Sequence, residues 1–223
     1  MKFILIIYFS VANAQEVKWM SIGDLHNWYS AAGSEIEVGR TGQVSDQQDG
    51  LRYPAFYRVQ DNQAAKGLWL GASNFYDPVV NKNYDKKVVH AGPRHLDIEN
   101  ETMPVKLTMD GKYDHPNVFV DGDPATNLQY LDYVDNVDPS LESDRKINNI
   151  VQTSLGVQMK RTIYAFAHPD HQNYHIQEYV FTNNGCFDKD CNTSYEQTLE
   201  GFQVYLQYRY AISREGMVYD GNW

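Results

Sequence analysis

Three consecutive segments between residues 155 and 212 alternate between apolar and polar residues, and this alternation constrains the fold more than any other feature. The alternating positions are Val157, Met159 and Ile163, with Tyr164 and Phe166 after a change of register; Tyr174, Ile176 and Val180; and Phe202, Val204, Leu206, Tyr208 and Tyr210. Successive side chains of a strand point to opposite faces, so a period of two indicates half-buried strands. Turn residues separate the segments. We therefore predict an antiparallel meander with one face in a core.

Short apolar segments separated by Gly, Pro, Asn or Asp recur through the rest of the chain, as is typical of a sandwich or barrel. Strands are expected over 52–60, 67–75, 86–91, 105–109, 118–120 and 147–155. Gly156 is expected where the last of these bends or bulges. Residues 21–32 fit a short helix or a surface turn, and 138–145 fit one helical turn. The predicted fold class is all-β, an antiparallel β-sandwich of the jelly-roll or immunoglobulin-like kind.

The first fourteen residues have the features of a secretory signal peptide. Lys2 precedes an apolar run over 3–11, and Ala12-Asn13-Ala14 is the small-x-small pattern that signal peptidase accepts. The run is too short to span a bilayer as a helix, and no other stretch is apolar enough to do so. We expect cleavage after Ala14, a secreted or cell-surface location, and a single β-rich domain over 15–223.

The charge balance narrows the classes of partner. The chain has 19 Lys and Arg against 29 Asp and Glu, a net charge of −10, and removal of the signal peptide takes away Lys2 and no acid. Nucleic acids and anionic lipids require a Lys/Arg surface, so neither is an expected partner. Divalent cations are compatible with this balance. The 17 tyrosines suit either an ordinary sheet or a sugar-binding face.

Cys186 and Cys191 are the only cysteines and are separated by four residues within one loop. In an exported chain such a pair indicates a local disulfide, worth about 2 kcal/mol on the chain-entropy estimate. A zinc site is the alternative, but zinc would require further ligands at fixed spacing and no second Cys pair exists.

An acidic segment over 121–144 contains seven Asp and Glu and no Lys, Arg or His before its end. Ca²⁺ takes six to eight oxygen ligands in a flexible shell, and the best candidates are Asp121, Asp123, Asp135 and Asp138. The spacing does not match an EF-hand loop. A solvated acidic loop is the favoured interpretation, because charge runs usually lie in solvent, and a calcium site is the alternative.

The sequence contains no recognisable catalytic constellation. It lacks a G-x-S-x-G nucleophile elbow, an H-E-x-x-H motif and a phosphate-binding loop. His168, His171 and His175 could suggest a metal cluster, but Pro169 and the alternation beyond Asn173 place them in a turn and on a strand, so a polar hairpin tip is favoured. A carboxylate pair for glycoside hydrolysis is defined by separation in space and is not readable from sequence.

Short motifs at 25–28, 33–40, 46–50, 115–116, 120–122, 138–141 and 179–183 resemble those of uncharacterised exported proteins of marine bacteria. Members of that group commonly end in a sorting domain of the type IX secretion system. The resemblance implies location rather than activity, because the group has no known chemistry. The chain stops at Trp223 without a sorting domain, so we expect it to be the N-terminal part of a longer protein, with a sandwich incomplete at the C-terminus.

These features predict an exported, non-enzymatic binding or structural module for an extracellular or cell-surface glycan or protein. The alternative is a secreted carbohydrate-active enzyme of the glycoside hydrolase kind, or its N-terminal β domain.

Overall fold

The computed structural model describes residues 16–35, 51–56, 62–91, 101–116, 119–124 and 132–210, and these residues form strands and turns without a helix. The strands are β1 (Val17–Met20), β2 (His26–Ser30), β3 (Leu51–Arg52), β4 (Gln63–Asp77), β5 (Lys82–Ala91), β6 (Thr102–Gly111), β7 (Phe119–Val120), β8 (Asp123–Pro124), β9 (Asn136–Val137), β10 (Arg145–Thr153), β11 (Val157–Ala165), β12 (Ile176–Asn183) and β13 (Glu200–Tyr210). The predicted signal peptide, residues 1–14, lies outside the described residues. The described residues contain no helix with the length and apolar character needed to span a bilayer.

One layer of the fold is a five-stranded sheet in the order β12-β11-β10-β6-β9. Its pairs are antiparallel except for the short parallel pair of β6 and β9. Side chains of β10 alternate between buried and half-buried along most of the strand, as the period of two in its sequence predicts. One face of this sheet therefore supplies the core.

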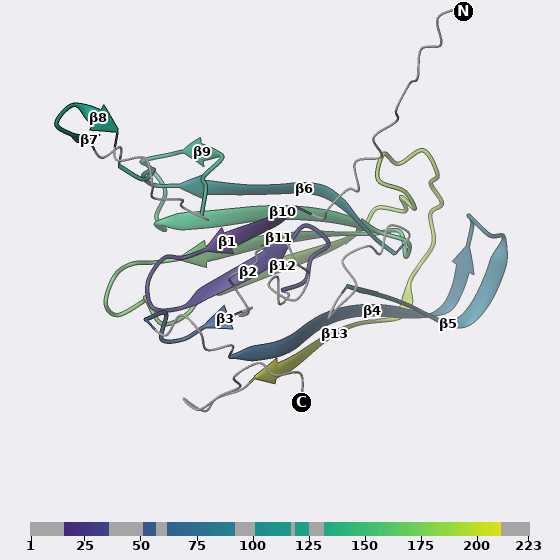
Figure 1. The fold of residues 1–223 in the computed structure, drawn as a ribbon. Coiled ribbons are helices and arrows are strands. Elements are labelled where there is room, and N and C mark those ends of the chain that lie inside the picture. Colours follow the sequence, from purple (N-terminus) through teal and green to yellow (C-terminus); the bar gives the residue numbers. More distant parts are fainter. Residues whose placement is uncertain are drawn as a thin grey trace, which may run out of the picture.

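Two three-stranded sheets, β1-β2-β3 and β13-β4-β5, cover that face (Figure 1). The first packs Met20, Tyr29 and Ala31 against β6, β10 and β11. The second packs Leu68, Leu70 and Val89, with other apolar side chains, against the opposite ends of β10 and β11. Burial of these apolar side chains removes them from water and holds the two layers together. The all-β, sandwich-like fold class is thus confirmed.

Most of the predicted strands are present. The expected segments at 67–75, 86–91 and 105–109 lie within β4, β5 and β6, and 119–120 forms β7. The segment expected over 52–60 is a strand only at Leu51–Arg52 and then bends over 53–56, while 57–60 fall outside the described residues.

The predicted meander is wrong at its third strand. β11 and β12 pair antiparallel as expected, but β13 pairs with β4 and belongs to the other layer. Alternation records which face of a strand is buried and does not specify which strand lies beside it. Residues 184–199 carry the chain from one layer to the other.

Three local predictions also require correction. Gly156, at φ +71°, forms the tight turn between β10 and β11 and not a bend within one strand. Residues 21–32 form neither a helix nor a turn throughout, because β1 and β2 pair as a hairpin with Trp19 opposite Trp28. Residues 138–144 form a turn closed by a hydrogen bond from the Leu141 amide to the Asp138 carbonyl, not a helical turn.

Candidate functional site

One face of the β10–β11 hairpin carries a polar pair between two apolar pairs. The facing residues, all buried, are Ile147–Ile163, Asn149–Arg161 and Val151–Met159. The first pair packs under β1-β2-β3 and the third under β13-β4-β5. The polar pair therefore lies at the junction of the two covering sheets.

Arg161 and Asn149 hold the turn that follows β2. Arg161 donates from Nη1 to the Gly33 carbonyl at 2.9 Å and from Nη2 to the Ser30 carbonyl at 2.9 Å. Asn149 donates from Nδ2 to the Ala31 carbonyl at 3.0 Å. Buried backbone carbonyls require donors, and these two side chains supply them from the opposite layer.

Gly33 allows the turn to pack closely against the five-stranded sheet. Its φ is +97°, a conformation that L side chains rarely adopt, and a Cβ built on it would overlap Cε of Met159. The turn then directs the side chain of Glu35 inward.

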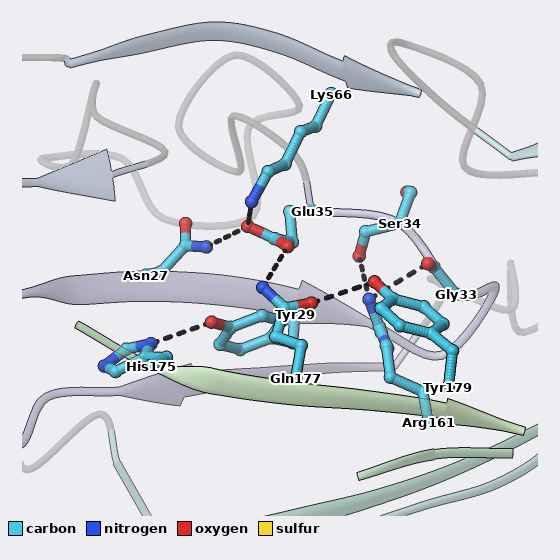
Figure 2. Close-up of polar contacts among 10 residues, drawn as sticks. All are labelled: Asn27, Tyr29, Gly33, Ser34, Glu35, Lys66, Arg161, His175, Gln177 and Tyr179. Carbon is cyan, nitrogen blue, oxygen red and sulfur yellow. Dashed lines mark hydrogen bonds and ion pairs between the residues drawn. The ribbon is translucent and has the colours of Figure 1, made fainter. Parts of the chain in front are cut away.

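Glu35 is the centre of a buried polar cluster, defined as Asn27, Tyr29, Glu35, Lys66, Arg161, His175, Gln177 and Tyr179 (Figure 2). Its side chain is 2% exposed and forms an ion pair with Lys66 of β4. Asn27 donates to the same carboxylate oxygen, and Gln177 Nε2 donates to the other at 2.7 Å. The carboxylate thus links β2, β4 and β12.

The electrostatics of Glu35 keep it ionised. Burial by itself would raise the pKa of this carboxyl, but the charge of Lys66 and hydrogen bonds from Lys66 and Gln177 outweigh it, so the pKa lies below its ordinary value. Glycosidase general acids require a raised pKa, so the environment of Glu35 is the opposite of the one such an acid needs.

Lys66 lies between Glu35 and the tyrosines of β13. Its Nζ is 4.6 Å from the ring centroid of Tyr208, a cation–π distance. Burial, and then the negative charge of Glu35, raise the pKa of Tyr208 to about 12, so its phenol stays neutral. The hollow beside these groups has a volume of about 10 Å³, roughly the room of one water molecule. In this arrangement the cluster has no space for a substrate.

His175 closes the other end of the cluster. Its Nδ1 lies 2.8 Å from Oη of Tyr29, and the two rings come from β2 and from the residue before β12. Burial is the main cause that lowers the pKa of His175 from 6.5 to about 4. The imidazole is therefore neutral at pH 7 and is a polar component of the core.

A second candidate site, the aromatic row, lies on the outer face of β13-β4-β5, turned away from the five-stranded sheet. It consists of Tyr205, Trp69 and His90, which face one another across β13, β4 and β5. The ring centroids of Trp69 lie 5.9 Å from Tyr205 and 6.0 Å from His90. Trp69 is 41% exposed and Tyr205 54%. Both ring pairs are edge-to-face, with interplanar angles of 64° and 65°, and the row is partly exposed to solvent.

Glycines leave the surface around Trp69 open. Gly67 and Gly71 are its same-face neighbours along β4, and a Cβ built on Gly67 would lie 3.3 Å from Nε1 of Trp69. The indole therefore leans over Gly67. Gln207 and Gln203, both exposed, lie opposite these glycines on β13. Their amides flank the row with donors and acceptors.

His90 is anchored from the side. Its Nδ1 lies 2.8 Å from a carboxylate oxygen of Glu101, and the same oxygen accepts the His90 backbone amide at 3.0 Å. This pair of contacts fixes the imidazole at one end of the aromatic row.

The predicted calcium ligands lie in two separate places. Asp121 and Asp123 belong to the exposed β7–β8 hairpin. Asp135 accepts the Met109 amide at 2.6 Å and pairs with Lys18 at 2.8 Å, and Asp138 accepts the amide and hydroxyl of Ser140. Across the part of the chain that the structure describes, no group of three or more His, Cys, Asp or Glu could hold a metal ion. Calcium binding stays a prediction.

The cysteine prediction is confirmed, because Cys186 and Cys191 form a disulfide. It closes a short loop on the path from β12 to β13. His168 and His171 lie in the turn before β12, with ring centroids 5.6 Å apart, whereas His175 points into the buried polar cluster.

Sequence reasoning did not identify either candidate site. For the buried polar cluster a signal was present, because Arg161 is an even number of residues from Val157, Met159 and Ile163 and so faces inward with them. A charged residue at an inward position of a strand requires buried partners. For the aromatic row the signal was Gly-Leu-Trp-Leu-Gly at 67–71, where the Trp is outward if the leucines are inward.

Comparisons of the chain with family models, curated proteins and solved structures found no match.

Proposed function

We propose that this protein is an exported, non-enzymatic module that binds a neutral glycan, extracellular or on a cell surface, through the aromatic row. The observation that carries the proposal is the exposure of Trp69 and Tyr205 side by side on the outer face of the β13-β4-β5 sheet. Aromatic side chains of this size are usually buried or covered, and an exposed group of them commonly marks a binding surface.

The chemistry of the row suits a sugar ring. The faces of aromatic rings are electron-rich, so they attract the weakly positive C–H bonds on one face of a pyranose. Gln203 and Gln207 lie on the same face and offer amide groups to hydroxyls. The net charge of −10 disfavours polyanionic polysaccharides, so the proposal is confined to neutral ones.

Carboxyl groups support a binding role over hydrolysis. The carboxyl group at the centre of the buried polar cluster, that of Glu35, has a pKa below its ordinary value, because Lys66 and Gln177 stabilise its ionised form. A glycosidase of the common kind uses one carboxylic acid with a raised pKa.

The proposal is tested by affinity electrophoresis and calorimetry against soluble neutral glucans, xylans and mannans. Trp69→Ala should weaken the affinity for any polysaccharide that binds by about tenfold or more, since loss of about 1.4 kcal/mol of stacking and burial corresponds to a factor of ten. Val88→Ala is the control, because Val88 is exposed on the same face of β5. No binding to any of the polysaccharides would overturn the glycan proposal. Steady release of reducing ends would overturn the non-enzymatic part and favour a carbohydrate-active enzyme.

The exported location has its own test. Intact-mass measurement of the protein recovered outside the cell should give a chain that begins at Gln15. A chain that retains residues 1–14, recovered only from inside the cell, would contradict it.

A further inference from the structure

β13 is an edge strand whose chemistry is unusual for an edge. Among the described strands it pairs only with β4. Its eleven residues form one of the longest strands, and between Phe202 and Tyr208 it has no charged residue and no proline. Edge strands of monomeric proteins are commonly short or protected by Lys, Pro or bulges. The register shifts of β13 fall near its two ends, and from Gln203 to Arg209 it pairs with β4 without interruption. Within the described residues, no strand pairs with the other side of β13, which carries a row of peptide groups that another strand could bind.

The inner face of β13 is also poorly covered. Val204 and Leu206 are each 40% exposed, although they lie opposite Leu70 and Leu68 of β4, which are 2% and 3% exposed. The five-stranded layer therefore covers β4 and leaves β13 partly open. Additional apolar surface would be buried if another strand lay beside β13.

The sequence of β13 is chemically symmetric about Tyr205. Moving outward from that residue, the pairs are Val204 and Leu206, Gln203 and Gln207, and Phe202 and Tyr208. In an antiparallel pair centred on Tyr205, these residues would face one another, apolar against apolar and amide against amide. A two-fold interface requires this self-complementarity, because each residue meets its symmetry counterpart.

We propose that β13 pairs antiparallel with β13 of a second copy of this chain, about a two-fold axis at Tyr205. The β13-β4-β5 sheets of the two copies then form one six-stranded sheet, in the order β5-β4-β13-β13-β4-β5. The register matches Tyr205 with the second copy's Tyr205, so outer faces stay on the same side. Main-chain hydrogen bonds across the new pair supply affinity, and the side-chain symmetry supplies the register.

The pairing joins the two aromatic rows end to end. His90, Trp69 and Tyr205 of one copy continue into Tyr205, Trp69 and His90 of the other on a single outer face. This inference rests on the edge of β13 and not on the glycan proposal, so a failure to bind polysaccharides leaves it standing. If both hold, the dimer offers a ligand a doubled surface.

A charge-swap experiment tests the pairing and its register. In the dimer each Gln203 faces the second copy's Gln207, whereas within one chain the two residues are four positions apart on an exposed face. Sedimentation equilibrium should show a dimer for the unchanged protein. In the double variant Gln203→Lys with Gln207→Lys, two lysines face each other at both positions, which should weaken dimerisation by about tenfold or more. In the variant Gln203→Lys with Gln207→Glu, a lysine faces a glutamate at both positions, and dimerisation should be restored.

A cross-linking experiment provides an independent readout. Cα atoms directly opposite in an antiparallel pair are about 4.5–5.5 Å apart, within the range a disulfide spans. Tyr205→Cys should therefore oxidise to a covalent dimer. Val88→Cys is the control, since Val88 is similarly exposed on the same face but lies on β5, at the opposite edge of the sheet from β13.

Two results would overturn the pairing. One is an unchanged protein that stays monomeric at its highest soluble concentration. The other is a dimer that both charge variants weaken equally and in which Tyr205→Cys cross-links no faster than Val88→Cys, because such a dimer would use another surface.

Discussion

Strand β4 contributes to two regions of opposite character. Lys66 points inward to an ion pair with Glu35, and Trp69, three residues later, points outward into solvent. The interior region is polar and its central groups are hydrogen-bonded within the molecule, whereas the surface region is aromatic and lacks cover. Buried polar groups are costly unless they are partnered, so the buried polar cluster contributes specificity to the packing of the layers. The aromatic row contributes little to the core and is available to a ligand.

The largest expected effect comes from breaking the ion pair. Glu35→Ala leaves the Lys66 ammonium buried without its carboxylate and should lower the free energy of unfolding by about 3–5 kcal/mol. Urea denaturation measures this loss. The surface variant Glu178→Ala should change the stability by about 0.5 kcal/mol or less. The double variant Glu35→Gln with Lys66→Met should recover most of the loss, since replacing both partners of a buried pair is often neutral. A loss below about 1 kcal/mol for Glu35→Ala would show that the pair is not important to the fold.

The next effect is a pH dependence from His175. The folded-state pKa is about 4 because of burial, against about 6.5 in an unfolded chain. Between these values the unfolded state binds more protons, so the contribution is fully present above about pH 6.5 and is lost as the pH falls toward 4, by about 3 kcal/mol. Thermal or urea unfolding between pH 4 and 7 measures the slope. His175→Gln should flatten it, and the exposed-site variant His168→Gln should not. Equal slopes in all three proteins would contradict the assignment.

A smaller effect is expected at the turn held by Arg161. Gly33→Ala introduces a side chain at φ +97° and against Cε of Met159, and should cost about 1–3 kcal/mol. Gly122→Ala is a matched comparison, because Gly122 has φ +92° with nothing within 4 Å of the added Cβ. The difference between the two in chemical denaturation isolates the packing of the turn from its backbone conformation. Identical losses would mean that the contact with Met159 relaxes without cost.

The smallest effect on stability should come from the outer face. Trp69→Ala removes cross-strand ring contacts worth about 0.2–1 kcal/mol each and no core packing, so the unfolding midpoint should fall only slightly. The same variant is expected to weaken glycan binding strongly. The two measurements together separate the contribution of Trp69 to stability from its contribution to binding. A stability loss as large as that of Glu35→Ala would indicate that the indole serves chiefly to cover Gly67.

Sequence periodicity was sufficient for the strands that face one layer, and insufficient for their arrangement. Burial on one face imposes a period of two, which is why β10, β11 and β12 were predictable. The partner of β13 depends on where a sixteen-residue connection at 184–199 leads, and no local pattern encodes that path. The disulfide was predictable because its two cysteines lie within one loop.

The candidate sites were harder to predict because they depend on contacts across long sequence separations. Glu35 and Lys66 come from parts of the chain whose proximity follows only from the docking of one sheet on another. Arg161 could be recognised as inward-facing, but its acceptors are backbone carbonyls, which every residue has. The aromatic row joins residues of three strands, and only the register brings them together.

The hydrogen bonds of Arg161 also bear on the order in which the molecule folds. The Ser30 carbonyl accepts its hydrogen bond from Arg161, which lies 131 residues further along the chain. Loop closure over such a separation is slow compared with formation of the local β10–β11 hairpin. The β1–β2 hairpin is synthesised before the rest of the described chain, yet we expect it to be among the last parts to reach its native contacts. It would dock onto a β10–β11 hairpin that is already formed.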